Sequence, residues 1–309
     1  MRAGRARGWV WRERSWRDCR AAARVCCRAE HETRSPDVEH FLRESWRSGQ
    51  PALGLWCTVG NTLVAEALAS VEPDYVCVDM QHGSSYEGNL VEMLQAVEAG
   101  GSSPVVRVPE NNPASIMKAL DAGARGVIVP LVESGEQAAR AVEACRFPPY
   151  GSRSFGPFRA SIHAKTSDPR ELEKVACVVM VETRAGIDHL EEIVETDGLT
   201  AVYVGPSDLS IALGLAPGSV DDPGFVSVLE EIRAACVAHD VVPGVHCYDG
   251  RTARRAVEQG FGMVTVAVEL RSLRAALGVE LAEARSAVLP LRPTSGTTPE
   301  PDVAAGTVA

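Results

Sequence analysis

Six polar side chains stand where short apolar runs of the sequence end. They are Asp79 and His82 after YVCV, Arg107 after PVV, Glu182 after CVVMV, Asp208 beyond AVYVG, and His246 after VVPGV. Carboxylates suit Mg²⁺ or Mn²⁺ as oxygen ligands, an arginine can stabilise a developing oxyanion, and a histidine can move protons near neutral pH. If the fold gathers them, these side chains suit carbon–carbon bond chemistry next to a 2-oxo group.

Each residue also has a plainer interpretation when it is taken alone. Arg107 fits a surface ion pair, and Glu182 or Asp208 fits a helix cap. Taken together, the residues favour a site in which Glu182 and Asp208 hold a divalent cation. Arg107 would then stabilise an enolate, and His82 would act as acid and base. Asp79 would hold either the loop that carries His82 or a metal-bound water, and His246 is expected to be structural or a pocket wall.

Eight apolar, β-prone runs alternate with segments whose apolar residues have helical spacing. The runs cover residues 53–57, 75–79, 104–108, 126–130, 177–182, 201–205, 241–246 and 263–268. Continuous apolar runs are typical of parallel strands buried on both faces. The sequence therefore predicts a single-domain α/β fold, a (β/α)8 TIM barrel, with the polar side chains at its carboxyl-terminal mouth. An open doubly wound sheet is the alternative, but no GxGxxG follows the first run.

A Schiff-base aldolase is the main mechanistic alternative to a metal-dependent one. It would need a lysine on a strand inside the barrel. The predicted domain contains Lys118, Lys165 and Lys174, and none of them ends an apolar run. The metal-dependent route is therefore preferred.

The composition limits the classes of partner. The chain has 309 residues, 45% of them apolar, and a formal net charge of −10. This charge argues against general nucleic-acid binding, and no apolar run reaches the ~18 residues expected of a membrane span. Nine cysteines without a CxxC or zinc spacing, together with no signal peptide, favour a reduced cytoplasm.

Both ends of the sequence differ from its middle. Residues 1–35 hold ten arginines and four acidic residues, so residues 1–37 are expected to form a basic N-terminal extension. A binding arm, a targeting peptide and sequence upstream of the true start are the three interpretations, and the last is preferred. Residues 289–309 are rich in Pro, Thr, Gly and Ala and are expected to be a disordered tail. The barrel is expected over residues 38–288.

Several motifs resemble those of the HpcH/HpaI aldolase family, the class II pyruvate-dependent aldolases, over roughly residues 46–280. They are GLW (54–56), VDMQHG (78–83), VVRVPENNP (105–113), MKALDAGARGVIVPLV (117–132), CRFPPYGSRSFGPFRA (145–160), MVETRAG (180–186) and VYVGPSDLSIALG (202–214). The resemblance implies a (β/α)8 barrel, a Mg²⁺, Mn²⁺ or Co²⁺ ion, and a homo-oligomer, a hexamer built from trimers. It also implies reversible cleavage of 4-hydroxy-2-oxo acids to pyruvate and an aldehyde through a metal-bound pyruvate enolate.

The resemblance also implies residue roles, carried over position by position. His82 and Arg107 match the acid/base and the enolate stabiliser, and Glu182 and Asp208 match the metal ligands. The Ser207 amide matches a contact to the pyruvyl carboxylate, and Asp121 matches the aspartate that raises the basicity of the histidine. Further substrate contacts are expected from Gly205, Trp56 and Gln81.

This chain also departs from the family pattern. Gln81 stands where many members have an acid, Met180 where some have a glutamine, and Asn112 where an aspartate precedes proline. A changed substrate is the preferred explanation. The long stretch 147–169 is expected to be functional, with Arg153, Phe155 and Arg159 either lining the aldehyde pocket or forming a surface arm. The same site would also suit a 2-oxo acid decarboxylase, and a non-catalytic sensor that kept the barrel is a third hypothesis.

Overall fold

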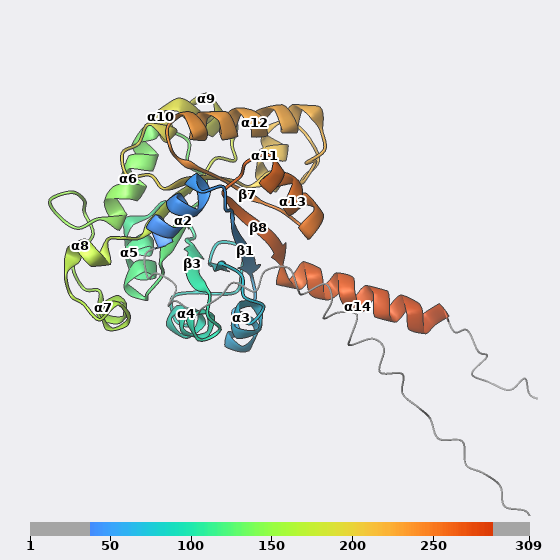
Figure 1. The fold of residues 1–309 in the computed structure, drawn as a ribbon, viewed down its shortest axis with the longest axis horizontal. Helices are drawn as coiled ribbons and strands as arrows, with labels where there is room; N and C mark the ends of the chain where they lie inside the picture. The colour runs from blue at the N-terminus through green and yellow to red at the C-terminus, as the bar shows by residue number, and fades with distance from the viewer. Residues whose placement is uncertain (1–37, 287–309) are drawn as a thin grey trace, which may run out of the picture. The chain divides into compact units, whose positions relative to one another are not determined.

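The computed structural model describes residues 38–286, and a closed barrel of eight parallel strands forms its centre (Figure 1). The strands follow one another around the barrel in chain order. They are β1 (Ala52–Cys57), β2 (Tyr75–Asp79), β3 (Ser103–Arg107), β4 (Gly126–Val129), β5 (Ala176–Met180), β6 (Ala201–Val204), β7 (Val242–His246) and β8 (Met263–Val268). The predicted (β/α)8 barrel is confirmed, and the open-sheet alternative is wrong.

Helices connect the strands and cover the outside of the barrel (Figure 1). In chain order they are α2 (Val38–Arg47), α3 (Thr62–Ala69), α4 (Leu90–Ala99), α5 (Pro113–Asp121), α6 (Gly135–Cys145), α7 (Phe158–Ala164), α8 (Pro169–Leu172), α9 (Arg184–Asp188), α10 (Leu190–Val194), α11 (Pro206–Ala212), α12 (Pro223–Ala238), α13 (Gly250–Glu258) and α14 (Glu269–Ser286). Asn61, Asn112 and Asp249 cap α3, α5 and α13, because their side chains accept hydrogen bonds from amides of the first turn.

Two apolar layers stabilise the barrel, one between the strands and the helices and one inside the barrel. The inner layer includes Trp56, Tyr75, Met180 and Tyr203, each at most 2% exposed. Successive side chains of a strand point to opposite faces, so the inner layer takes every second residue. Leu42 of α2 belongs to this layer, and α2 contacts β1, β5 and β7, so that helix closes the end of the barrel opposite the mouth.

The last helix, α14, extends away from the barrel wall (Figure 1). None of its side chains is buried, and four leucines are 44–54% exposed: Leu270, Leu273, Leu277 and Leu281. Spacings of three and four residues place these leucines on one face of the helix. An apolar helix face of this size indicates a surface that another molecule covers.

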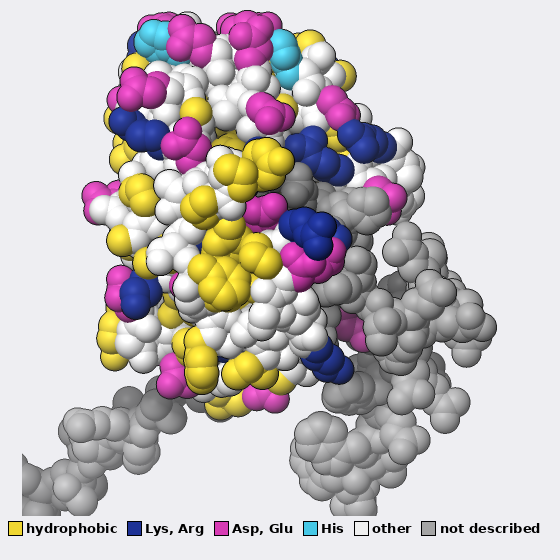
Figure 2. Space-filling view, turned by 90° about the vertical axis from the view of Figure 1, so that its left-hand side faces the viewer, with side chains coloured by type: hydrophobic (Ala, Val, Ile, Leu, Met, Phe, Trp, Pro, Cys, Tyr) yellow, Lys and Arg dark blue, Asp and Glu magenta, His cyan; other side chains and the backbone are white. Residues whose placement is uncertain are grey.

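The expectations for the two ends of the chain, residues 1–37 and 289–309, lie outside the described residues. Between those ends, the elements run from Val38 to Ser286. None of the described helices combines the length and the apolar character needed to cross a membrane. The face on the side of α6, α7 and α8 carries apolar side chains among charges of both signs (Figure 2). Phe158 and Ile162 of α7 are among the exposed apolar residues.

Candidate active site

The inward-facing positions of the strands end in polar residues at the mouth of the barrel. Asp79 on β2, Arg107 on β3, Glu182 just after β5 and His246 on β7 each follow an inner core residue in steps of two. Because the strands are parallel, these positions lie at the same end of the barrel. Every second side chain of a strand points into the barrel. These side chains are apolar inside the barrel and polar at the carboxyl ends of the strands, where they form the floor of the mouth.

Asp79 and Arg107 form a buried ion pair in this floor. The register of β2 and β3 places the two residues opposite each other. Arg107 donates from Nε to Oδ1 at 2.9 Å and from Nη2 to Oδ2 at 2.5 Å. The side chain of Asp79 is 1% exposed and that of Arg107 is 10% exposed. A two-bonded arginine–carboxylate pair of this kind fixes the direction of the guanidinium.

Asp79 also organises the residues around it. Its carboxylate accepts hydrogen bonds from the Trp56 indole N–H at 3.1 Å and from the backbone N–H groups of Gln81 and His82 at 3.0 and 3.2 Å. Burial would raise the pKa of Asp79, but the hydrogen bonds and charge of Arg107 outweigh burial and lower it. Asp79 is therefore ionised and supports four neighbours, in keeping with its position before His82.

The same pair makes Arg107 important for stability. Burial works against the charged guanidinium, but Asp79 outweighs burial and raises the pKa of Arg107. Removing the arginine would leave a buried carboxylate without its cation, so Arg107→Ala loses stability as well as turnover. Within the described residues, Nη1 of Arg107 donates no hydrogen bond, and this amino group is the donor left for a substrate oxygen.

An aromatic wall stands beside the ion pair. The central carbon of the Arg107 guanidinium lies over the Trp56 ring, 5.0 Å from the ring centroid. The Trp56 and His246 rings meet edge to face, with 4.9 Å between their centroids. His246 in turn meets the Tyr248 ring at 5.7 Å, and the Tyr248 and Ser207 hydroxyl groups are 2.7 Å apart. Burial lowers the pKa of His246 to about 4, and the charge of Arg107 adds to the effect. His246 is thus a neutral wall at physiological pH.

Glu182 is a carboxylate in an unfavourable position for its charge. The residue is 2% exposed, and its Oε1 accepts one hydrogen bond, from the Leu131 backbone N–H at 3.1 Å. Leu131 holds a φ of 55°, a conformation that side chains rarely adopt and that is often kept at functional sites. Burial raises the pKa of Glu182 to about 7 against this hydrogen bond, and the charge of Asp208 adds to the shift.

The surroundings of Glu182 fit a divalent cation. Asp208, in the first turn of α11, supplies a second carboxylate that faces solvent. Gly205 lets the Glu182 carboxylate pack directly against the backbone, since a Cβ at that position would lie 2.1 Å from Oε2. Two hard carboxylate ligands suit Mg²⁺ or Mn²⁺, which complete their coordination with water or substrate oxygens. A second acidic group, Glu191, Glu195 and His239, lies on the outer helices and away from the mouth.

His82 stands in the loop after β2 and is exposed at the mouth. Its neighbour Gln81 has a buried Oε1 that finds no hydrogen-bond donor among the described residues. A buried acceptor without a donor is costly, so this oxygen marks an unsatisfied position next to His82. The structure thus brings Gln81 and His82 to the same end of the barrel as Arg107 and Glu182.

Glu269, the first residue of α14, is linked by hydrogen bonds to the loop that carries His82. Its Oε1 accepts from the N–H and hydroxyl of Thr58 at 2.6 and 2.7 Å, and from the Val59 N–H at 2.6 Å. The Thr58 carbonyl accepts from the Ser84 N–H at 2.7 Å, two residues beyond His82. A continuous chain of hydrogen bonds therefore joins the start of α14 to the loop that carries the candidate acid/base.

Two groups of predicted site residues lie elsewhere. Asp121 ends α5, at the opposite end of the barrel, where it pairs with the buried Arg153 at 2.8 Å. Arg153 also lies over the Phe147 ring, and Arg159 donates to the Ala122 carbonyl. The interpretation of Arg153, Phe155 and Arg159 as a wall of this chain's aldehyde pocket is therefore wrong. The stretch joins a helix to the following strand, and such connections lie at the amino-terminal end of the barrel.

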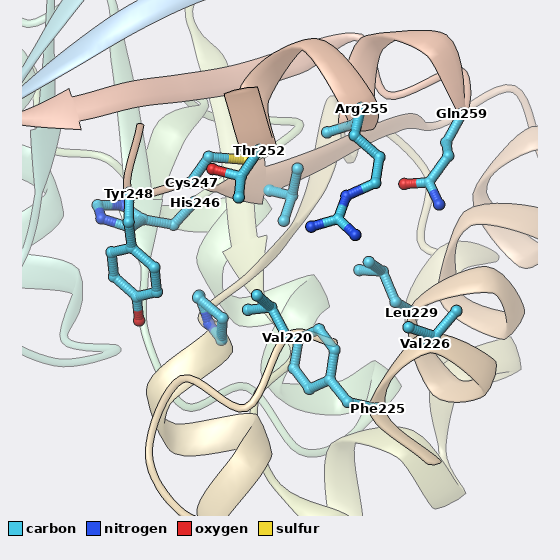
Figure 3. Close-up of a pocket in the computed structure, with 13 residues that line it drawn as sticks. Val220, Phe225, Val226, Leu229, His246, Cys247, Tyr248, Thr252, Arg255 and Gln259 are labelled. Carbon is cyan, nitrogen blue, oxygen red and sulfur yellow. The ribbon is translucent and has the colours of Figure 1, made fainter. Parts of the chain in front are cut away.

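One cavity among the described residues lies beside the mouth rather than in it. It encloses about 120 Å³ between α12 and α13, with Phe225 and Leu229 on one side (Figure 3). Arg255 and Gln259 approach it from α13, while His246 and Tyr248 border it toward the mouth (Figure 3). The cavity thus touches the back of the aromatic wall and does not include Glu182 or Asp208.

A parallel eight-stranded barrel with acids, an arginine and a histidine at its carboxyl end defines the class of barrel enzymes with a mouth-centred site. The family model for "HpcH/HpaI aldolase/citrate lyase" matches residues 52–276, and the chain belongs to this family. The chain is accordingly a lyase. It is 38% identical over 247 residues to a "Hydroxypyruvate/pyruvate aldolase" of Rhizorhabdus wittichii, covering 79% of this chain and 98% of that protein.

Two further relatives extend the comparison. A "4-hydroxy-2-oxo-heptane-1,7-dioate aldolase" of Salmonella typhimurium is 31% identical, over 81% of this chain and 96% of that protein. The crystal structure of an HpcH/HpaI aldolase/citrate lyase family protein from Burkholderia cenocepacia has a TM-score of 0.74 and 33% identity. That match covers 80% of this chain and 99% of the other. The three proteins are similar to this chain over nearly their whole length.

Proposed function

We propose that this protein is a divalent-cation-dependent aldolase that cleaves 4-hydroxy-2-oxo acids reversibly to pyruvate and an aldehyde. The observation that carries the proposal is the joint position of Arg107, Glu182, Asp208 and His82 at one mouth. A cation, an enolate stabiliser and a proton carrier are the three groups that breaking a bond next to a pyruvyl group requires. The aldolase names of the relatives agree with this reaction.

Glu182 and Asp208 would hold the cation, Mg²⁺, Mn²⁺ or Co²⁺. When bound, the cation supplies a Lewis acid that polarises the 2-oxo group. The amide of Ser207 stands in the first turn of α11, where amides have no helical acceptor, and it would bind the pyruvyl carboxylate beside Gly205. The Trp56 ring would cover one side of the bound acid, since it lies between Arg107 and His246.

Two residues would carry out the bond-breaking step, His82 by proton transfer and Arg107 by stabilising the enolate. His82 removes the proton of the 4-hydroxyl group, the C3–C4 bond breaks, and the aldehyde leaves as the electron pair enters the enolate. Arg107 stabilises the enolate oxygen through Nη1, and Asp79 keeps the guanidinium in place. The proton on His82 then passes to C3, which gives pyruvate and restores the site.

A coupled lactate dehydrogenase assay for pyruvate tests the proposal. Wild-type protein with Mg²⁺, Mn²⁺ or Co²⁺ should release pyruvate from a panel of 4-hydroxy-2-oxo acids. Glu182→Gln should release pyruvate more slowly at the same limiting cation concentration, whereas Glu191→Gln, on the outer acidic group, should keep the wild-type rate. Release of CO₂ from oxaloacetate without cleavage of any hydroxy acid would instead support a decarboxylase. No turnover of either kind, with no cation bound, would support a non-catalytic sensor.

We also propose that the protein is a homo-oligomer. The four exposed leucines on one face of α14 support this, because a second copy would bury a surface that its own barrel leaves open. The resemblance to the family points to a hexamer or a trimer. Asp121 could act on His82 only from a neighbouring subunit, since in its own chain it lies at the far end of the barrel. Light scattering would give the number of subunits.

The proposed location is a reducing cytoplasm. Within the described residues six cysteines, all buried, are free thiols. Burial raises the pKa of Cys57 and Cys247 to about 12, so these thiols are protonated and unreactive. Their role is the packing of small apolar groups.

A further inference from the structure

Arg271, the third residue of the exposed helix α14, is a cation at the mouth that the reaction does not use. β8 ends at the mouth and α14 begins there, so the first turn of α14 lies on the side of Asp208 and His246. Arg107, which also belongs to the site, is neutralised by Asp79. Among residues 38–286, no carboxylate lies within ion-pair distance of Arg271. This charge is therefore available to an anionic ligand.

Tyr248 keeps this arginine in place. The guanidinium lies over the Tyr248 ring at 4.5 Å, and the Tyr248 hydroxyl is 2.7 Å from the Ser207 hydroxyl. Ser207 is the residue next to Asp208, so the arginine is tied to the proposed pyruvate site through a single aromatic ring. A guanidinium stacked on an aromatic face loses freedom but keeps its N–H edges for a ligand.

The direction of a bound substrate follows from these positions. If Ser207, Glu182 and Asp208 hold the pyruvyl half, the aldehyde half extends from the reacting carbons toward the rim. Arg271 and Tyr248 stand on that rim, beyond the aromatic wall of Trp56 and His246. Arginine presents a planar pair of donors that matches a carboxylate.

We infer that Arg271, positioned by Tyr248, binds a carboxylate on the aldehyde half of the substrate and selects acidic aldehydes over neutral ones. The inference rests on the proposed aldolase function and adds the chemical class of its acceptor. With this role for Arg271, the first turn of α14 contributes two residues to the site. Glu269 supports the His82 loop, and Arg271 faces the substrate.

The test compares two aldehydes of equal length in the condensation with pyruvate. Wild-type enzyme should use 4-oxobutanoate with a kcat/KM at least about tenfold above that for butanal. Arg271→Met should lower kcat/KM for 4-oxobutanoate by about 10- to 100-fold, mainly through KM, and change the value for butanal less than about threefold. Arg271→Lys should restore part of the preference. Arg274→Met, about one turn further along the same exposed helix, should leave the ratio of the two values unchanged.

Two variants of Tyr248 separate the ring from its hydroxyl. Tyr248→Phe keeps the surface under the guanidinium and should keep the preference for the acidic aldehyde. Tyr248→Leu removes the ring and should lower the preference. An equal loss for both aldehydes in Arg271→Met, or no loss for either, overturns the inference and leaves the aldolase proposal standing. Absence of condensation with any aldehyde in the wild type overturns the aldolase proposal and the inference with it.

Discussion

Replacing Asp79 by asparagine tests whether the buried ion pair organises the site. The carboxylate accepts five hydrogen bonds, two from Arg107 and one each from Trp56, Gln81 and His82. An asparagine has the same shape, but its NH₂ group would face either Trp56 Nε1–H and Arg107 Nη2, or the two backbone N–H groups and Arg107 Nε. At least two donors then lose their acceptor, and the guanidinium remains buried without a counter-charge.

The expected loss of unfolding free energy for Asp79→Asn is about 3–5 kcal/mol, the usual cost of removing one partner of a buried pair. In a domain of this size that corresponds to a fall in Tm of about 10 °C. Urea unfolding at a fixed protein concentration measures the loss. Asp240→Asn is the matched control, because Asp240 pairs with Arg47 at the surface, where both side chains are more than half exposed. That variant should lose less than about 1 kcal/mol.

The pH dependence of the loss gives a second test. The pKa of Asp79 is lowered in the folded state, so its stabilisation is complete above the ordinary aspartate pKa and is lost as the pH falls through the folded value. The difference in unfolding free energy between wild type and Asp79→Asn should therefore shrink only below about pH 4. Equal stabilities of Asp79→Asn and Asp240→Asn at pH 7, or a difference independent of acid, would refute the reasoning.

Four further changes have expected outcomes. His82→Gln should lower kcat by about 10²–10⁴-fold in the pyruvate assay, with unchanged cation binding. Glu269→Ala should lower kcat about 10- to 100-fold by releasing the His82 loop, and Glu269→Gln, which keeps an oxygen acceptor, should recover most of it. Gly205→Ala should weaken Mn²⁺ binding, read by calorimetry, at least about tenfold, because the new methyl group meets Glu182 Oε2. Leu277→Lys should reduce the mass of the oligomer in light scattering.

Each of these changes has an outcome that contradicts it. A normal kcat in His82→Gln would assign the proton transfer to another group. Equal activities of the Ala and Gln variants of Glu269 would show that its three hydrogen bonds do not act on the loop. Unchanged Mn²⁺ affinity in Gly205→Ala would place the cation elsewhere, and an unchanged mass in Leu277→Lys would mean that α14 is not the contact between copies.

Much of the barrel could be predicted because each strand is a continuous apolar run. The predicted runs 75–79 and 241–246 end at the same residues as β2 and β7, Asp79 and His246, and the run 104–108 extends one residue past the end of β3 at Arg107. Helix caps such as Asn61 are also local signals, because the capping side chain lies next to the helix that it caps in the sequence. The polar floor follows from the same runs, because two-residue alternation carries the inward face of a strand to its last residue.

Several further features depend on contacts between distant parts of the chain. Glu269 meets Thr58 across 211 residues, and no spacing or motif marks the pair. The φ of Leu131, which directs its N–H to Glu182, is set by the surrounding loop and not by a glycine. The direction of α14 away from the barrel has only a weak signal in the sequence, the run of leucines. The helical spacing of these leucines predicts packing against the barrel equally well.

The position of residues 147–169 could have been predicted correctly. In a (β/α)8 barrel a connection from a helix to the next strand lies at the amino-terminal end, and this stretch lies between α6 and β5. Its length indicated function, but topology places it opposite the mouth. Tyr248 could also have been found, as the second residue after the strand that ends in His246.

The most direct test of the central claim is a titration of Mn²⁺ into metal-stripped protein while pyruvate release from a 4-hydroxy-2-oxo acid is recorded. Wild-type protein should show a saturable rise from no activity. Glu182→Gln should need at least about tenfold more Mn²⁺ for the same rate, because it lacks a carboxylate ligand. Identical titration curves for the two proteins, or pyruvate release that does not depend on the cation, would contradict the account.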